Sequence, residues 1–320
     1  MMQCPPLSAA ALAGIFAAAL AFSSPAHGES EGHQILIQGK GKLAVLEPDG
    51  KVSWEMPWGA IHDVHVVPGS GNYMMQRGGR EVVEIDPATK EVVWSYESAE
   101  GNEVHALQPL EDGNVMIAES GAARIIEVDR DGTIVKEVAL KVDNPHPHRD
   151  TRLARKLDSG NYLVCHEGDG AVREYDGESG EVVWEYAVPM FGREPAGGHG
   201  LEAFGNSVFG AVRLENGNTL IATGNGHSVL EVTPEKEIVW KIEQDDLAEQ
   251  GVRLAWVTTL EVLPDGHYVI GNCHAGPENP ILIELDPETK KVVWRLDGFE
   301  QFGNDVSNTL VLDAPEGTRR

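Results

Sequence analysis

The stretch VVEIDPATKEVVW at residues 82–94 decides the fold. β-Branched residues alternate with charged ones on both sides of a DPAT turn, which is the period of two strands joined in a hairpin. Similar stretches occur five more times, as LAVLEPDGKVSW (43–54), IIEVDRDGTIVK (125–136), VREYDGESGEVVW (172–184), VLEVTPEKEIVW (229–240) and LIELDPETKKVVW (282–294). The chain therefore contains six copies of one two-strand unit.

A second hairpin signal precedes five of the six copies. It reads VPGSGNYMM (67–75), LEDGNVMIA (110–118), LDSGNYLVC (157–165), LENGNTLIA (214–222) and LPDGHYVIG (263–271). Glycine beside Asp, Asn or Ser supplies the positive φ that a tight hairpin requires. The two signals together give four strands per unit at intervals of about 42 to 57 residues, which is the length and strand count of a propeller blade.

The two ends of the repeat predict how the ring closes. The first unit, which begins near QILIQ (34–38), lacks an opening strand, whereas NTLVLDAPEG (308–317) resembles an opening strand and turn with nothing after it. We therefore predict an all-β fold, a six-bladed β-propeller in which the C-terminal strand completes the N-terminal blade and leaves no exposed sheet edge. Seven blades is the alternative.

The N-terminal residues have the composition of an export signal. No Lys, Arg, Asp or Glu occurs through Gly28, and an apolar run from Leu7 to Phe22 is followed by SSPAHG, whose small residues suit cleavage. We expect a secretory signal peptide at residues 1–28 and a single propeller domain at 29–320. The protein is then exported to the periplasm or the exterior.

Charge and cysteine content narrow the classes of partner. Lys and Arg number 25 against 51 Asp and Glu, so the net charge is -26. This excess of carboxylates repels phosphate backbones and anionic lipid, which argues against nucleic acid and membrane surfaces as partners.

Two cysteines, Cys165 and Cys273, follow the predicted signal peptide. An oxidising compartment permits a disulfide between them, but two cysteines in a chain of this length do not form a disulfide framework. Neither has CxxC spacing, and no metal site is expected.

The repeat separates structural residues from functional candidates. The Trp of the last strand recurs, as does a Glu two places before the turn, and we assign both a role in holding blades together; the glutamates are Glu84, Glu127, Glu174, Glu231 and Glu284. Residues that break the repeat are better functional candidates. On the innermost strand, which lines the central channel, these are His62, Asp63, His105, Thr151, Arg152, Thr258 and Asn308, and the loops between blades add His146, His148, Arg149 and His199.

These candidates suggest two kinds of chemistry. Histidines and arginines beside a channel suit an anionic ligand, and histidine can also shuttle a proton or act as a nucleophile. We take His62, His105 and Arg152 as candidate catalytic residues and the other eight as candidate ligand contacts. Asp63 is next to His62, but adjacent strand positions point to opposite faces. The HxxH spacing of His62 and His65 on a strand also fits zinc geometry poorly.

The GNYLV (160–164) and VVWEY (182–186) elements resemble pyrroloquinoline-quinone-like repeat β-propellers, and with IHD (61–63) they are similar to the propeller of the bacterial arylsulfotransferase family. That resemblance implies a central histidine nucleophile, matched by motif to His62, with His105, His148, Arg149 and Arg152 nearby. The separate N-terminal β-domain of those enzymes has no counterpart here. The quinone-dependent dehydrogenases are eight-bladed and use adjacent cysteines, which this chain lacks, so no cofactor is predicted.

Three functions follow from these observations. The first is an exported module that binds a small molecule, glycan or protein at the loop-covered face of the channel without catalysis. The second is an arylsulfotransferase-like enzyme in which a channel histidine accepts the sulfuryl group. The third is a non-catalytic assembly scaffold, which leaves the histidines without a role.

Overall fold

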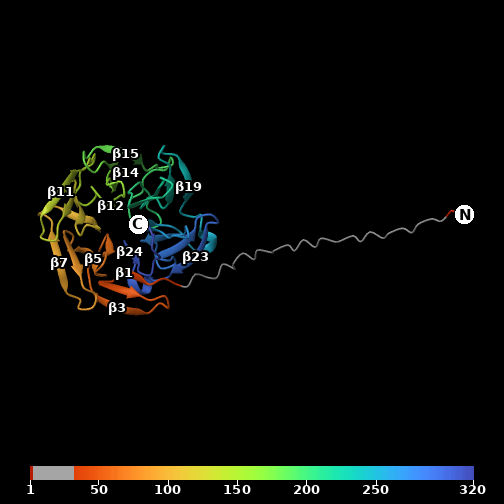
Figure 1. Cartoon of the computed structure of the whole chain (residues 1–320), viewed down its shortest axis with the longest axis horizontal. Coiled ribbons are helices and arrows are strands. Elements are labelled where there is room, and N and C mark those ends of the chain that lie inside the picture. Colours follow the sequence, from red (N-terminus) through yellow and green to blue (C-terminus); the bar gives the residue numbers. More distant parts are fainter. Residues whose placement is uncertain (3–31) are drawn as a thin grey trace.

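The computed structural model describes residues 1–2 and 32–320, so the predicted signal peptide lies, apart from its first two residues, outside the described part of the chain. The described residues form six four-stranded antiparallel sheets around a central channel (Figure 1). The prediction of an all-β, six-bladed propeller is confirmed. No helix in this part of the chain has the length and hydropathy needed to span a bilayer.

The first three blades run from the N-terminus, each given from its innermost strand outward. Blade 1 contains β24 (Thr309–Val311), β1 (Ile35–Gly39), β2 (Lys42–Leu46) and β3 (Val52–Pro57). Blade 2 contains β4 (Val64–Val66), β5 (Tyr73–Arg77), β6 (Glu81–Ile85) and β7 (Val92–Glu97). Blade 3 contains β8 (Glu103–Pro109), β9 (Val115–Ser120), β10 (Arg124–Val128) and β11 (Ile134–Ala139).

The remaining three blades complete the ring. Blade 4 contains β12 (Ala154–Lys156), β13 (Tyr162–His166), β14 (Ala171–Tyr175) and β15 (Val182–Ala187). Blade 5 contains β16 (Gly210–Arg213), β17 (Thr219–Ala222), β18 (Val229–Val232) and β19 (Ile238–Ile242). Blade 6 contains β20 (Trp256–Val262), β21 (Tyr268–Cys273), β22 (Leu282–Asp286) and β23 (Lys291–Leu296). Two short helices, η1 (Ala248–Gln250) and α1 (Phe299–Phe302), lie in connections.

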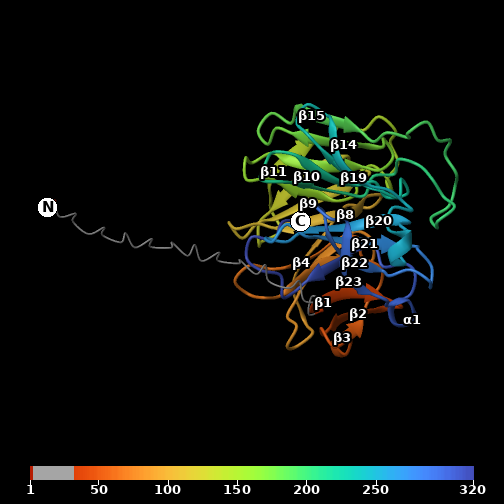
Figure 2. The ribbon, with the colours of Figure 1, turned by 90° about the vertical axis from the view of Figure 1, so that its right-hand side faces the viewer.

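The ring closes as the repeat predicted. β24 pairs antiparallel with β1, with Thr309 opposite Ile37 and Val311 opposite Ile35. A C-terminal strand thus supplies the innermost strand of the N-terminal blade, and the C-terminus lies at the centre of the disk (Figure 1). The connection between β15 and β16 extends from one face of the disk (Figure 2).

The recurring Trp and Glu residues join neighbouring blades, as the repeat indicated. The indole N–H of Trp54 donates to the carbonyl of Pro87 in the next blade at 2.7 Å, and Trp94, Trp184 and Trp240 make the same contact with later blades. Each recurring Glu accepts a hydrogen bond from its own blade or forms an ion pair with a side chain of the next blade. Glu174, for example, binds both Asn161 and Arg213, each at 2.7 Å. The structural assignment of these two sets is therefore confirmed.

The two cysteines of the described chain are buried free thiols. Cys165 packs in the apolar layer between blades 4 and 5, and Cys273 packs beside Trp256 and Phe209. Burial raises the pKa of both thiols far above their usual range, so neither is a thiolate nucleophile at neutral pH.

Candidate functional site

A β-bulge in β8 turns His105 toward His62. Val104 pairs with Glu119 and Ala106 with Ala118, so His105 has no partner across the ladder. A bulge adds one residue to a strand and redirects a side chain. The two imidazole rings lie 4.6 Å apart, edge to face. In a regular strand, the register of the repeat would align His105 with Asp63. The extra residue in the bulge shifts His105 by one position, so that it aligns with His62 instead.

The loop of residues 142–150 supplies a third imidazole. Asp150 accepts the backbone N–H of His146 at 2.5 Å, and the N–H of Arg149 donates to the His146 carbonyl at 2.7 Å, which folds the HPHRD segment into a tight turn. The ring of His148 then lies 5.2 Å from that of His105 and 6.3 Å from that of His62. We call His62, His105 and His148 the histidine cluster.

Glu103 connects two members of this cluster. Its Oε2 lies 2.7 Å from Nδ1 of His148 and 3.1 Å from Nε2 of His105. His105 and His148 lower the pKa of Glu103 to about 2. Burial lowers the pKa of His105 to about 4 and holds that of His62 well below its usual range. His62 and His105 are therefore neutral at neutral pH, beside an ionised carboxylate.

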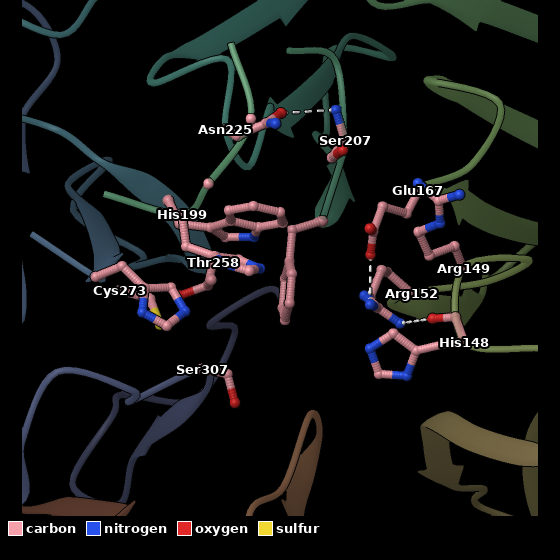
Figure 3. A pocket seen from close by; sticks show the side chains of 15 residues that line it. His148, Arg149, Arg152, Glu167, His199, Ser207, Asn225, Thr258, Cys273 and Ser307 are labelled. Carbon is pink, nitrogen blue, oxygen red and sulfur yellow. Dashed lines mark hydrogen bonds and ion pairs between the residues drawn. The ribbon is translucent and has the colours of Figure 1, made fainter. Parts of the chain in front are cut away.

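A pocket of about 380 Å³ adjoins the histidine cluster (Figure 3). Its lining includes His148, Arg149, Arg152, Glu167, His199, Ser207, Phe209, Asn225, Trp256, Thr258, Cys273, His274 and Ser307. His62 itself is absent from this lining, but its ring stacks on that of Phe209 with the centroids 6.4 Å apart. His62 and His105 thus lie next to the pocket, where the partly exposed His62 contacts Phe209 and the buried His105 contacts His148.

Two walls of different character face each other across the pocket. The cationic wall consists of Arg149 and Arg152 with Glu167, and the aromatic wall consists of Trp256, His199 and His274. Figure 3 shows Arg149 and Arg152 on the opposite side of the pocket from His199. The ring of His199 lies 4.9 Å from that of Trp256 and 5.0 Å from that of His274.

The charges of the cationic wall are only partly compensated. Nη2 of Arg152 lies 2.5 Å from Oε2 of Glu167, and Nη1 donates to the His148 carbonyl at 2.5 Å. Burial raises the pKa of Glu167, against the attraction of Arg152. Arg149 is exposed and forms no ion pair with any residue that the structure describes. Arg149 is therefore the guanidinium of this wall that lacks a paired carboxylate among the described residues.

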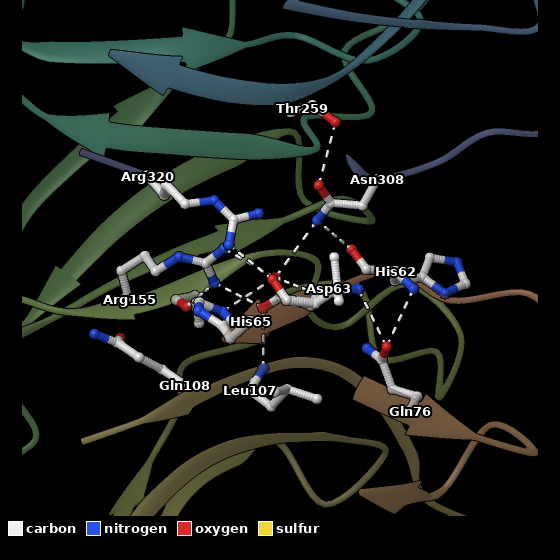
Figure 4. A network of polar contacts seen from close by, with 12 residues as sticks. His62, Asp63, His65, Gln76, Leu107, Gln108, Arg155, Thr259, Asn308 and Arg320 are labelled. Atoms are coloured by element: carbon white, nitrogen blue, oxygen red, sulfur yellow. Dashed lines mark hydrogen bonds and ion pairs between the residues drawn. The ribbon is translucent and has the colours of Figure 1, made fainter. Parts of the chain in front are cut away.

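Asp63, a candidate ligand residue from the sequence, lies outside the pocket. It is fully buried in a polar network at the centre of the ring (Figure 4). Arg155 binds both carboxylate oxygens, at 2.7 and 2.9 Å, and His65 lies 3.3 Å from Oδ1. Burial alone would raise the pKa of Asp63, but Arg155 and His65 outweigh it and hold the pKa below its usual range. Its oxygens are therefore engaged by the protein itself.

Three other sequence candidates are also absent from the pocket lining. Asn308 is buried and donates from Nδ2 to the His62 carbonyl at 2.8 Å, which fixes the backbone beneath the histidine cluster. Thr151 is buried, and its backbone N–H donates to Ser120 at 3.2 Å. His146 is exposed and its ring accepts the N–H of His148 at 3.2 Å. The structure thus gathers His148, Arg149, Arg152, His199 and Thr258 at the pocket, with His62 and His105 in contact with lining residues.

Several residues of the site have no distinctive sequence signal. The sequence did not identify three residues of the site as candidates, because the repeat marks none of them as chemically unusual. They are Glu103, Phe209 and Trp256. Arg155 offered one usable signal, since an arginine in an inner strand of a propeller is buried and needs a charged partner. Arg320 also enters the ring centre, where its guanidinium donates to the carbonyls of Val64 and Thr309 at 2.7 and 3.0 Å.

Comparison with solved structures supports the fold. A protein of unknown function from Bacteroides caccae is similar over 87% of this chain and 98% of its own, with a TM-score of 0.71 and 24% identity. A streptogramin B lyase is similar over 84% of this chain and 83% of its own, with a TM-score of 0.55 and 10% identity. A catalytically inactive virginiamycin B lyase from Staphylococcus aureus with quinupristin covers 84% of each chain at a TM-score of 0.53 and 13% identity. At these identities the likeness shows the fold alone.

Family membership rests on the sequence match. No curated protein matches the chain. Residues 39–296, which include at least part of every blade, match the PQQ-like repeat family model described as outer membrane protein assembly factor BamB. The chain therefore belongs to the BamB-like family of PQQ-like repeat β-propellers.

Proposed function

We propose that the protein is an exported propeller that binds a small aromatic anion in the pocket between the cationic and aromatic walls. The observation that carries this proposal is the placement of Arg149, which has no ion-pair partner among the described residues, across the pocket from Trp256 and His199. A guanidinium binds carboxylate, sulfate or phosphate oxygens at two points. An aromatic wall stacks with a flat apolar group.

The size of the pocket supports a small ligand. A volume of about 380 Å³ is at the lower end of the range of roughly 300–1,000 Å³ that small-molecule sites occupy. Fixed polar groups among apolar ones, as with Thr258, Ser207 and Asn225 here, are typical of such sites. Among the partners considered from the sequence, the pocket therefore favours a small molecule over a long glycan or a protein.

The proposal is tested by thermal shift with a matched ligand set. Phenyl sulfate and benzoate should raise the midpoint of unfolding, because a ligand that binds only the folded state stabilises it. Phenol and benzyl alcohol, which lack the charge, should not. Arg149→Gln should abolish the shift, whereas Arg193→Gln, an exposed arginine outside this pocket, should retain it. Equal shifts in both variants would remove Arg149 from the site.

Sulfuryl transfer is the second candidate, favoured by the convergence of His62, His105 and Arg152. A neutral imidazole nitrogen of His62 would attack the sulfur of an aryl sulfate, and the S–O bond to the ring would break to release a phenolate that takes up a proton. A second phenol would then remove the sulfuryl group from the histidine. Neutral His62 has the free electron pair that this attack needs.

The position of His62 makes transfer the weaker candidate. His62 is not among the residues that line the pocket, so an aryl sulfate bound there would have to move toward His62 before the imidazole could attack. The test is transfer from an aryl sulfate to a phenol acceptor by the wild-type protein and by His62→Ala. Turnover that disappears in His62→Ala would support the nucleophile; no turnover in the wild type, or equal turnover in both, would exclude it.

A further inference from the structure

We propose that Glu103, His105 and His148 form a binding site for a divalent transition-metal ion such as zinc. One carboxylate oxygen and one nitrogen from each of two imidazoles lie within 4.8 Å of one another. Two residues come from β8 and one from the loop 142–150, so the site joins blade 3 to the entrance of blade 4. This metal site does not depend on the proposed binding of an aromatic anion.

The separations of the donor atoms suit a metal ion. Oε2 of Glu103 lies 2.7 Å from Nδ1 of His148 and 3.1 Å from Nε2 of His105. Zinc binds nitrogen and oxygen at about 2.0–2.2 Å, so tetrahedral ligands stand roughly 3.4 Å apart. Outward shifts of a few tenths of an ångström would therefore admit an ion, and the exposed side chain of His148 is free to make such a shift.

The burial of His105 is an independent observation that points to a ligand. Its side chain is 2% exposed, yet neither ring nitrogen makes an aligned hydrogen bond with a described residue. Its Nε2 is near Glu103, but the two groups are not oriented as donor and acceptor. Buried polar groups are almost always partnered. A metal ion would supply the partner that Nε2 lacks.

The donor set indicates the class of metal. Two imidazoles and one carboxylate are typical of zinc and other first-row transition ions, whereas calcium and magnesium prefer oxygen donors. Because His148 also lines the pocket, the remaining coordination position would open toward the pocket. Three protein ligands and an open position are the pattern of reactive zinc sites, and structural sites are closed by a fourth protein ligand.

A second cluster with similar spacing has a structural explanation. Asp265, His267 and Glu284 also bring their donor atoms within 4.8 Å. His267, however, occupies the position of the hairpin Asn in other blades, and its Nδ1 lies 2.6 Å from Glu284 just as Asn72 donates to Glu84 at 2.7 Å. The repeat therefore accounts for that cluster, whereas His105 and His148 correspond to no repeated contact.

The test is calorimetric titration of zinc chloride into chelator-treated protein. We expect one site in the wild type and at least about tenfold weaker binding in Glu103→Gln and His148→Ala, since even changes behind the ligands cost roughly that much. His267→Ala is the matched control and should keep the wild-type affinity. Circular dichroism of each variant checks that the propeller remains folded.

Three results would overturn the proposal: no zinc binding by the folded wild type, equal affinity in the wild type and both ligand variants, or loss only in His267→Ala. Arg149→Gln separates this site from the proposed function, because it should lose the aromatic anion and keep zinc. If Arg149→Gln and the wild type both bind zinc but neither binds the anion, the metal site stands and the proposed function fails.

Discussion

Arg155 and Asp63, which are 92 residues apart in the chain, meet in a two-point ion pair at the centre of the ring. Asp63 also accepts the backbone N–H of Leu107 at 3.1 Å, and Asn308 approaches it from blade 1 at 3.4 Å. One carboxylate therefore contacts the inner strands of blades 2, 3 and 4 and the segment that leads into β24. The pair holds together the blades that support the histidine cluster.

Replacement of the Asp63 carboxylate by a neutral amide should destabilise the propeller severely. Asp63→Asn leaves the buried guanidinium of Arg155 without its counter-charge, and the loss of one partner of a buried ion pair costs about 3–5 kcal/mol. Urea unfolding of the wild type and of Asp63→Asn measures the difference. A loss of less than about 1 kcal/mol would contradict the assigned role. Asp49→Asn, at an exposed ion pair with Lys51, should change stability little and serves as the control.

The buried histidines should make the fold less stable below neutral pH. His166 is fully buried between the Asp150 carbonyl and the Tyr175 hydroxyl, and burial lowers its pKa to about 4. The unfolded state therefore binds one proton more than the folded state between about pH 6.5 and pH 4. Stability falls as the pH decreases through that window, by up to about 1.4 kcal/mol per pH unit for each such histidine.

The contribution of His166 to this slope can be isolated. His166→Gln should be less stable than the wild type at pH 7, because its hydrogen bonds are altered, but should lose less stability between pH 7 and pH 5. Urea unfolding at both pH values provides the comparison. An unchanged pH dependence would mean that His166 takes up its proton equally in the folded and unfolded states.

The indole contacts between blades should contribute measurably to stability. Trp94→Phe removes the donor to the Arg130 carbonyl, which lies 3.0 Å from Nε1, and should cost about 1–3 kcal/mol. Lys136 occupies the same repeat position in blade 3 and pairs there with the exposed Glu178. Lys136→Ala should therefore cost less than about 1 kcal/mol. Equal losses in guanidinium unfolding would show that the indole hydrogen bond is unimportant.

The repeat was sufficient to predict the architecture. Strand alternation and hairpin glycines recur in every blade, so the number of blades, the closure by Thr309–Val311 and the structural role of the recurring Trp and Glu all follow from local pattern. Such features depend on short-range sequence periodicity, which needs no knowledge of neighbouring blades.

The site was predicted only in part, because it depends on irregularities. The sequence marked His62, His105, His148 and Arg152 as candidates, but the bulge at Val104–Ala106 that brings the rings together has no signature in the repeat. Asp63 was marked beside His62 and instead binds Arg155, since contacts across three blades cannot be read from the register of one strand. Loop conformation likewise decides which side of the pocket His199 reaches.

The most direct test of the pocket is calorimetric titration of phenyl sulfate into the wild type and into Arg149→Gln at low and high salt. We predict that Arg149→Gln weakens binding at least about tenfold, a difference of about 1.4 kcal/mol, and that added salt weakens binding to the wild type more than binding to the variant. Equal affinity of the two proteins at both salt concentrations would contradict the proposal that the cationic wall recognises an anion.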